Sequence, residues 1–231
     1  MTLVGPLGVG KTRLAVHVAR AVLSRGAWMA GLSGLAHQPL VPQVVASALS
    51  VREPSGQSVT DALIDHISHD FALLVLDNCE HLLDACAILA STLLASCPHL
   101  SILATSRECL QVDGEVPWQV PSLAVPLPGT PLEEVAGNDA VRLFMDRVPL
   151  NDFALTEEAA AAVAEICRRL DGLPLAIELA AGRVGPLTPE QIAARLDQRF
   201  ELLITASHDV PPGHRSLHAA LQSSHRVALR D

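Results

Sequence analysis

The segment from Gly5 to Thr12 restricts the possible folds more than any other part of this 231-residue chain. It reads G-P-L-G-V-G-K-T, which places two glycines, a lysine and a threonine at the fixed positions of G-x-x-x-x-G-K-[ST]. In this pattern the glycines let backbone N–H groups surround phosphate oxygens, the lysine reaches the β and γ phosphates, and the threonine hydroxyl ligates Mg²⁺. Lys11 is also the only lysine among the 16 Lys and Arg residues, so the single lysine side chain of this sequence lies in this segment.

The flanks of this segment have the strand and helix that a phosphate-binding loop requires. An apolar strand is predicted before it, over 2–4, and apolar residues at helical spacing predict a helix over 11–24. The positive end of that helix points at the same anion. A glycine turn with a solvated lysine is the alternative. The predicted nucleotide-contacting residues of the loop are Gly5, Gly8, Val9, Gly10, Lys11, Thr12 and Arg13.

A second predicted strand ends in an acidic residue. The apolar run 71–76 is typical of a strand buried on both faces of a parallel sheet, and Asp77 follows it. Asp77 is therefore predicted to hold Mg²⁺ together with Thr12, directly or through water. The alternative is a capping box, with Asp77 as N-cap and Glu80 at the third position of a helix over 79–96. Glu80 is also the nearest carboxylate able to orient a water molecule, as a catalytic residue.

A third strand, over 101–106, ends at Arg107. Because strands of a doubly wound sheet direct their carboxyl ends at the ligand, Arg107 is predicted to contact a γ-phosphate, with a solvated loop arginine as the alternative. Further strands are predicted over 27–32 and 116–120. The predicted fold class is α/β: a P-loop NTPase parallel sheet flanked by helices, followed by a small all-α domain.

The composition changes after the last of these strands. Five prolines between Pro117 and Pro131 exclude a helix or a central strand there and indicate a linker. Beyond it, helices are predicted over 138–148, 156–170, 173–182 and 188–200. The predicted domains are a nucleotide-binding domain over 1–124, a linker over 125–136 and a small helical domain over 137–205.

Composition also argues against several functions. The net charge is -9 and no segment concentrates base, so direct DNA contact is not expected. No uninterrupted apolar stretch is long enough to span a membrane and no leader opens the chain, which predicts a cytoplasmic protein. The five cysteines form no C-x-x-C pair and are expected to be buried free thiols. Three groups of histidines are expected to lie on solvated faces rather than to bind a metal ion. They are His214 with His218 and His225, His66 with His69, and His81 beside Glu80.

Four motifs in a fixed order carry a resemblance to a known family. Gly5 to Thr12 is followed by L-V-L-D-N-C-E-H-L at 74–82, A-T-S-R-E at 104–108 and I-C-R-R-L-D-G-L-P-L-A-I-E-L-A-A at 166–181. Together they resemble the nucleotide-binding module of the signal-transduction ATPases with numerous domains (STAND, NB-ARC type). The bacterial transcriptional regulators of the AfsR/SARP and LuxR kind are the most similar group.

The resemblance implies a switch that is closed with ADP and opened by exchange for ATP. It implies phosphate contact by Gly10, Lys11 and Thr12, Mg²⁺ coordination by Asp77, γ-phosphate sensing by Arg107 and adenine contact by Pro174. It also implies effector and sensor domains that this chain lacks, a nucleotide-dependent oligomer, and the start of an incomplete winged-helix-like domain over 206–231.

Two departures from the family pattern refine these expectations. Asn78 stands where many relatives have a second acid, which predicts slow ATP hydrolysis, and only four residues precede Gly5, which predicts weak adenine binding. The chain is therefore expected to be an ATP/ADP-binding regulatory switch. The alternatives are an NTP-dependent enzyme or phosphotransferase of the P-loop class, and a truncated remnant that only binds.

Overall fold

The computed structural model describes residues 1–22, 26–52, 56–67, 72–149 and 154–196. It divides the chain into two compact units, the first made of Met1–Gly5 with Lys11–Val120 and the second of Pro6–Gly10 with Pro121–Asp231. Each unit has its own elements. The predicted winged-helix segment, 206–231, lies outside the described residues.

The first unit contains a parallel sheet of five strands in the order β2-β3-β4-β1-β5. Its strands are β1 Thr2–Val4, β2 Ala27–Gly31, β3 Ala72–Asp77, β4 Leu100–Ser106 and β5 Pro117–Gln119. The register pairs Gly31 with Asp77, and Val4 with Ser106. The carboxyl ends of the central strands therefore meet at one edge, which is where the predicted site residues lie.

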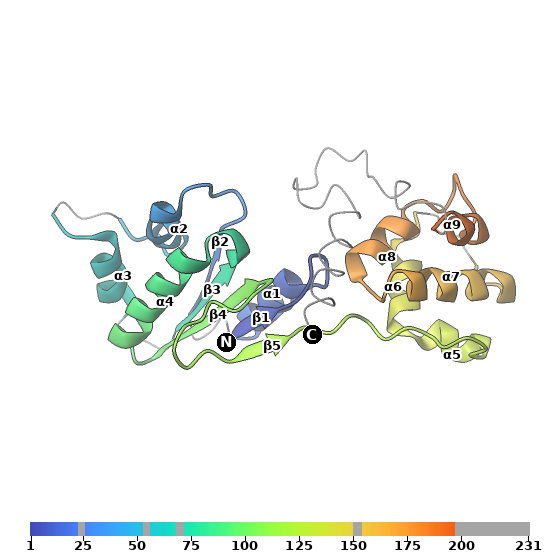
Figure 1. Cartoon of the computed structure of the whole chain (residues 1–231), viewed down its shortest axis with the longest axis horizontal. Coiled ribbons are helices and arrows are strands. Elements are labelled where there is room, and N and C mark those ends of the chain that lie inside the picture. Colours follow the sequence, from blue (N-terminus) through green and yellow to red (C-terminus); the bar gives the residue numbers. More distant parts are fainter. Residues whose placement is uncertain (23–25, 53–55, 68–71, 150–153, 197–231) are drawn as a thin grey trace. The chain divides into compact units, whose positions relative to one another are not determined.

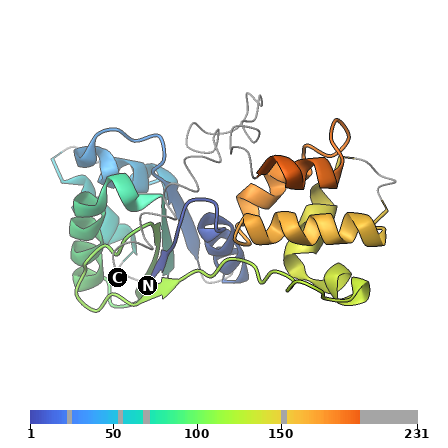
Figure 2. The same cartoon turned by 45° about the vertical axis from the view of Figure 1, so that its right-hand side comes forward.

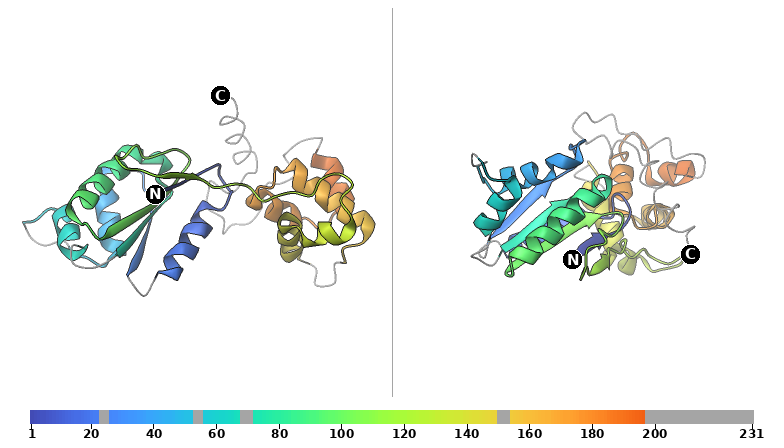
Figure 3. Two further views of the ribbon diagram at one scale, coloured as in Figure 1. Left: turned by 90° about the horizontal axis from the view of Figure 1, so that it is seen from below. Right: turned by 60° about the vertical axis from the view of Figure 1, so that its left-hand side comes forward.

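Helices cover both faces of this sheet. Its helices are α1 Lys11–Ala21, α2 Val41–Ala48, α3 Val59–Ile67 and α4 Leu83–Ser96. Helices α2, α3 and α4 form one layer, whose core includes Leu74 and Leu76 of β3. Because strand side chains alternate, Leu73 and Val75 face the opposite side, where α1 packs against the sheet (Figures 1 and 3).

The burial of β3 confirms the expectation of a strand enclosed on both faces. Leu74, Val75 and Leu76 are all 0% exposed, although they point alternately to the two sides. The predicted α/β class is therefore confirmed. Helices α2 and α3 have no counterpart in the sequence analysis, and β5 is an exposed edge strand that starts at Pro117, the position where an edge strand accommodates proline.

The second unit is helical (Figure 2). Its helices are α5 Leu132–Gly137, α6 Asp139–Arg147, α7 Glu157–Arg169, α8 Pro174–Ala181 and α9 Pro189–Leu196. Helix α6 packs on α8, and α7 packs on α5, α6 and α9; Phe144 of α6 is fully buried. Two predicted starts have side-chain caps: Asn138 accepts from the Ala140 N–H (3.0 Å) and Thr156 accepts from the Ala159 N–H (3.3 Å).

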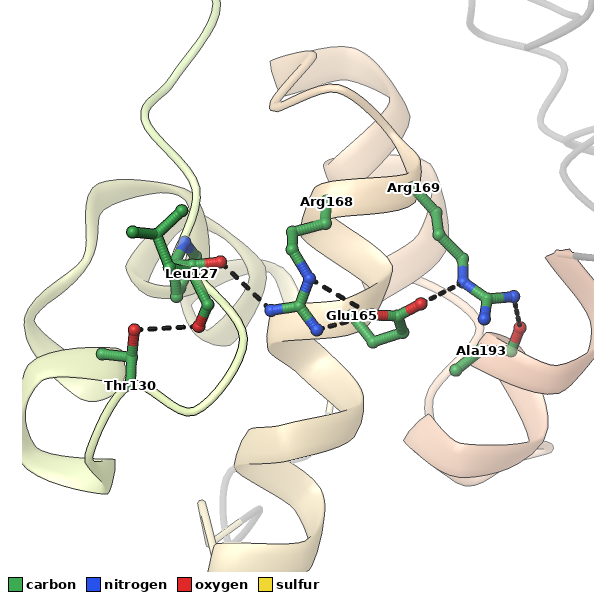
Figure 4. A network of polar contacts seen from close by, with 7 residues as sticks. Leu127, Thr130, Glu165, Arg168, Arg169 and Ala193 are labelled. Atoms are coloured by element: carbon green, nitrogen blue, oxygen red, sulfur yellow. Dashed lines mark hydrogen bonds and ion pairs between the residues drawn. The ribbon is translucent and has the colours of Figure 1, made fainter.

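A polar network ties α7 to the proline-rich segment 121–131 and to α9 (Figure 4). Glu165 accepts hydrogen bonds from Arg168 and Arg169, which lowers the pKa of the Glu165 carboxyl. Arg168 also donates to the carbonyl of Pro126 (3.1 Å), and Arg169 donates to that of Ala193 in α9 (3.2 Å). One acidic side chain thus orients two arginines that hold the proline-rich segment and α9 against α7.

The described helices are all too short or too polar to cross a lipid bilayer.

Candidate functional site

The loop between β1 and α1 has the backbone that a phosphate-binding loop needs. Gly8 and Gly10 have φ angles of 83° and 102°, in the region that side chains other than glycine rarely adopt. Lys11 is the first residue of α1 and only 8% exposed, and its Nζ donates to the carbonyl oxygen of Gly5 (2.8 Å). The ammonium is thereby folded back over the loop, at the amino end of the helix.

The predicted metal ligands lie next to each other at the carboxyl end of β3. The Thr12 hydroxyl donates to Oδ1 of Asp77 (2.7 Å), across 65 residues of sequence. The Thr105 hydroxyl donates to the same oxygen (2.6 Å) and accepts from the N–H of Asn78 (2.9 Å). The pairing of Leu76 with Ala104 in the β3–β4 ladder places Thr105 beside Asp77.

Thr105 is a site residue that the sequence analysis did not identify. It is 1% exposed, and its hydroxyl both donates and accepts, so it fixes the orientation of the Asp77 carboxylate and of the chain that leaves β3. The sequence feature that could have identified Thr105 is a polar side chain near the end of an apolar strand, next to the strand that ends in Asp77.

Glu80 and Arg107, both predicted site residues, form an ion pair. The Nε of Arg107 donates to Oε1 of Glu80 (3.2 Å). The other carboxylate oxygen of Glu80, Oε2, is buried and has no hydrogen-bond partner among the described residues. The capping-box alternative is wrong: a 3₁₀ turn, Cys79–His81, follows Asn78 with its φ of 68°, and α4 begins only at Leu83.

The charges of these residues act on one another. Burial lowers the pKa of the Lys11 ammonium, Glu80 and Asp77 raise it, and Arg107 lowers it. Two cations and two carboxylates therefore lie within electrostatic range at this edge of the sheet. This is the pattern expected where charged phosphates and a metal ion are balanced.

The remaining predicted residues occupy varied positions. Val9 is buried at 4% exposure, whereas Arg13 lies on the exposed side of α1. Pro174 is the first residue of α8 and Leu175 follows it. Within the second unit, the Leu175 N–H donates to the Gly8 carbonyl (3.1 Å), and a Cβ on Gly8 would lie 2.7 Å from the Leu175 Cβ. Gly8 is thus required both by its φ angle and by this close approach.

Two of the histidines that the sequence analysis singled out, His66 and His81, have partners in the structure. His66 packs edge-on against Trp28 with ring centroids 6.0 Å apart, and Nε2 of His81 donates to the Leu35 carbonyl (3.0 Å). Within the described ranges, no group of three or more His, Cys, Asp or Glu side chains is arranged to hold a metal ion. His69, His214, His218 and His225 lie outside these ranges. The cysteines are free thiols, of which Cys109 alone is half-buried and the others are buried.

The residues at the carboxyl edge fit Mg²⁺ bound together with phosphate. Mg²⁺ prefers oxygen ligands and is commonly held by one or two protein oxygens plus substrate phosphates. The Thr12 hydroxyl and the Asp77 carboxylate supply such oxygens 2.7 Å apart, and Thr12 is exposed. The positive end of α1 and Lys11 supply the complementary charge for the anion.

Comparison with known proteins places the chain among bacterial relatives. No protein-family model matches it. It is 41% identical over 232 residues to Rv0894, an uncharacterized protein of Mycobacterium tuberculosis, covering 98% of this chain and 56% of the relative. It is 42% identical over 230 residues to Rv0890c of the same organism, provisionally named an HTH-type transcriptional regulator, covering 98% of this chain and 25% of that protein. The chain thus spans 56% of the length of the first relative and 25% of the length of the second.

Solved structures share the fold at low sequence identity. Cdc6p from Pyrobaculum aerophilum matches with a TM-score of 0.51 and 16% identity, over 77% of this chain and 52% of that protein. The ORC2 protein of Aeropyrum pernix, solved as ADPNP–ADP complexes, matches with a TM-score of 0.53 and 13% identity, over 89% of this chain and 64% of that protein. At such identities the likeness supports the fold alone.

Proposed function

We propose that this chain is an ATP/ADP-binding regulatory switch module of a signal-transduction ATPase that controls transcription. The observation that carries the proposal is the cluster of Lys11, Thr12, Asp77 and Thr105 at the carboxyl edge of the sheet, next to a loop with glycine-only backbone angles. The relative provisionally named a transcriptional regulator supports the regulatory context.

The STAND/NB-ARC assignment belongs to this proposal. It is supported by the order of the four motifs along the chain, from the phosphate loop to the G-L-P-L segment at 172–175. In this assignment Pro174 contacts the adenine base. Effector and sensor domains respond to the switch, and assembly of several chains depends on the bound nucleotide. The assignment gives phosphate contact to Gly10, Lys11 and Thr12. The other nucleotide-contacting residues of the loop are Gly5, Gly8, Val9 and Arg13.

Thr12 and Asp77 would hold Mg²⁺, which when bound supplies positive charge beside the phosphates. Thr105 keeps the Asp77 carboxylate oriented. Hydrolysis is proposed to be slow, because Asn78 follows Asp77 where an acid would help to orient water, and because Oε1 of Glu80 is already bound to Arg107.

Asp77→Asn tests the metal assignment. Asparagine keeps an oxygen that accepts from Thr12 and Thr105, but it removes the charge that Mg²⁺ requires. We expect affinity for Mg²⁺-ATP to fall by about 10-fold or more, the equivalent of about 1.4 kcal/mol, while affinity for metal-free ADP changes by less than about 2-fold. Calorimetric titration of each ligand measures both values.

Asp84→Asn is the matched control. Asp84 is an exposed acid in the first turn of α4, so its replacement removes the same charge from the same unit away from the site. It is expected to leave both affinities unchanged. Equal losses of Mg²⁺-ATP and metal-free ADP affinity in Asp77→Asn would contradict the metal assignment.

A further inference from the structure

Glu80 forms an ion pair with Arg107, one of the two cations assigned to the terminal phosphate. Its Oε1 accepts from Arg107, and its Oε2 is buried without a hydrogen-bond partner among the described residues. Burial lowers the pKa of the Lys11 ammonium, and the negative charge of Glu80 acts to raise it. The carboxylate is 14% exposed, so solvent screens it only partly.

A carboxylate in this position affects a triphosphate and a diphosphate differently. The γ-phosphate brings additional negative charge to Lys11 and Arg107, and it must compete with Glu80 for Arg107. At short range in a partly buried site, repulsion between like charges is substantial. ADP has no γ-phosphate, so it is subject to little of this competition.

We propose that Glu80 is a specificity-determining residue that favours ADP over ATP, by engaging Arg107 and placing negative charge beside the cations that the third phosphate needs. This proposal rests on the proposed nucleotide-binding function and adds a cause for a resting preference. It gives Glu80 a part beyond orienting water, because its Oε1 pairs with Arg107.

The test is the ratio of the affinities for ADP and a non-hydrolysable ATP analogue in Glu80→Gln. Both ligands are titrated with Mg²⁺ into the full 231-residue chain by calorimetry. Glutamine has nearly the same size as glutamate and no charge. We expect affinity for the ATP analogue to rise about 10-fold relative to that for ADP. Glu80→Ala, which also removes the charge, is expected to shift the ratio in the same direction.

Glu108→Gln is the control, because Glu108 is an exposed carboxylate next to Arg107 in sequence. It removes the same charge and is expected to leave the ratio unchanged. An unchanged ratio, or a fall in relative affinity for the ATP analogue, in folded Glu80→Gln and Glu80→Ala would overturn the proposal while leaving nucleotide binding intact. Failure of the unmodified chain to bind either ligand would instead overturn the proposed function, and this inference with it.

Discussion

Replacing Lys11 with alanine is expected to lower the affinity for both ATP and ADP by about 10- to 100-fold. The change removes a charge-assisted contact to phosphate worth roughly 1.5 to 3 kcal/mol. No other lysine exists to replace it, and the ammonium is held over the loop by the Gly5 carbonyl at 2.8 Å. Calorimetric titration of each nucleotide measures the effect.

Arg20→Ala is the control for this variant. Arg20 is an exposed base in the last turn of α1, so its loss removes one positive charge from the same helix at the end far from the phosphate loop. Nucleotide affinity is expected to stay within about 2-fold of the unmodified chain. If Lys11→Ala also stayed within that range, the loop would not be the phosphate site.

Gly172→Ala is expected to destabilise the second unit by about 3 kcal/mol or more. Gly172 has a φ of 64°, and a Cβ placed on it would lie 2.0 Å from the carbonyl oxygen of Leu123. The obstructing atom is backbone, and it is held close because the Leu123 N–H donates to the Gly172 carbonyl (3.0 Å). Neither group can move away without breaking the contact between the proline-rich segment 121–131 and the junction of α7 with α8.

The measurement separates the two units. Both tryptophans, Trp28 and Trp118, lie in the first unit and the chain has no tyrosine. We expect Gly172→Ala to move to lower urea the part of the helical circular-dichroism signal that comes from α5 to α9, while the tryptophan fluorescence transition stays near its original position. Gly129→Ala is the matched control in the second unit: it has a φ of 82° but no heavy atom within 4 Å of its Cβ, so only the conformational cost of about 1 kcal/mol is expected. Equal effects of the two variants would contradict the steric argument.

The central strands and the phosphate loop were predictable because their signals are local. The apolar run before Asp77 and the pattern from Gly5 to Thr12 each occupy adjacent residues, and the structure contains β3 and the loop where they were expected. Helices α7 and α8 were predictable for the same reason, since Thr156 marks the start of α7 and Pro174 that of α8.

Short elements were harder to predict. Helices α2, α3 and α5 have eight, nine and six residues. Each therefore shows apolar periodicity over only about two helical turns, which is too short to distinguish a helix from an apolar loop. Helix α5 lies inside the segment interpreted as linker. Its N-cap is Pro131, the last of the prolines that suggested the linker.

Contacts between distant residues account for the rest of what the sequence analysis missed. The capping-box interpretation of Glu80 used only its neighbours, whereas its partner Arg107 lies 27 residues further along the chain. Thr105 contacts Asp77 across 28 residues, because β3 and β4 are adjacent in the sheet. Strand order and register decide such pairs, and neither is encoded in a local pattern.

Titration of ADP and ATP into the unmodified chain, in the presence of Mg²⁺, tests the central claim most directly. The purified chain is first unfolded, and mass spectrometry identifies any nucleotide that it releases. The chain is then separated from that nucleotide and refolded. We predict saturable binding of one nucleotide per chain for both ligands, together with a rise in the unfolding temperature. The account would be contradicted by a refolded chain that unfolds cooperatively, releases no nucleotide on denaturation and binds neither ligand at about 1 mM. That concentration would detect even a weak site with a binding free energy of about -4.1 kcal/mol.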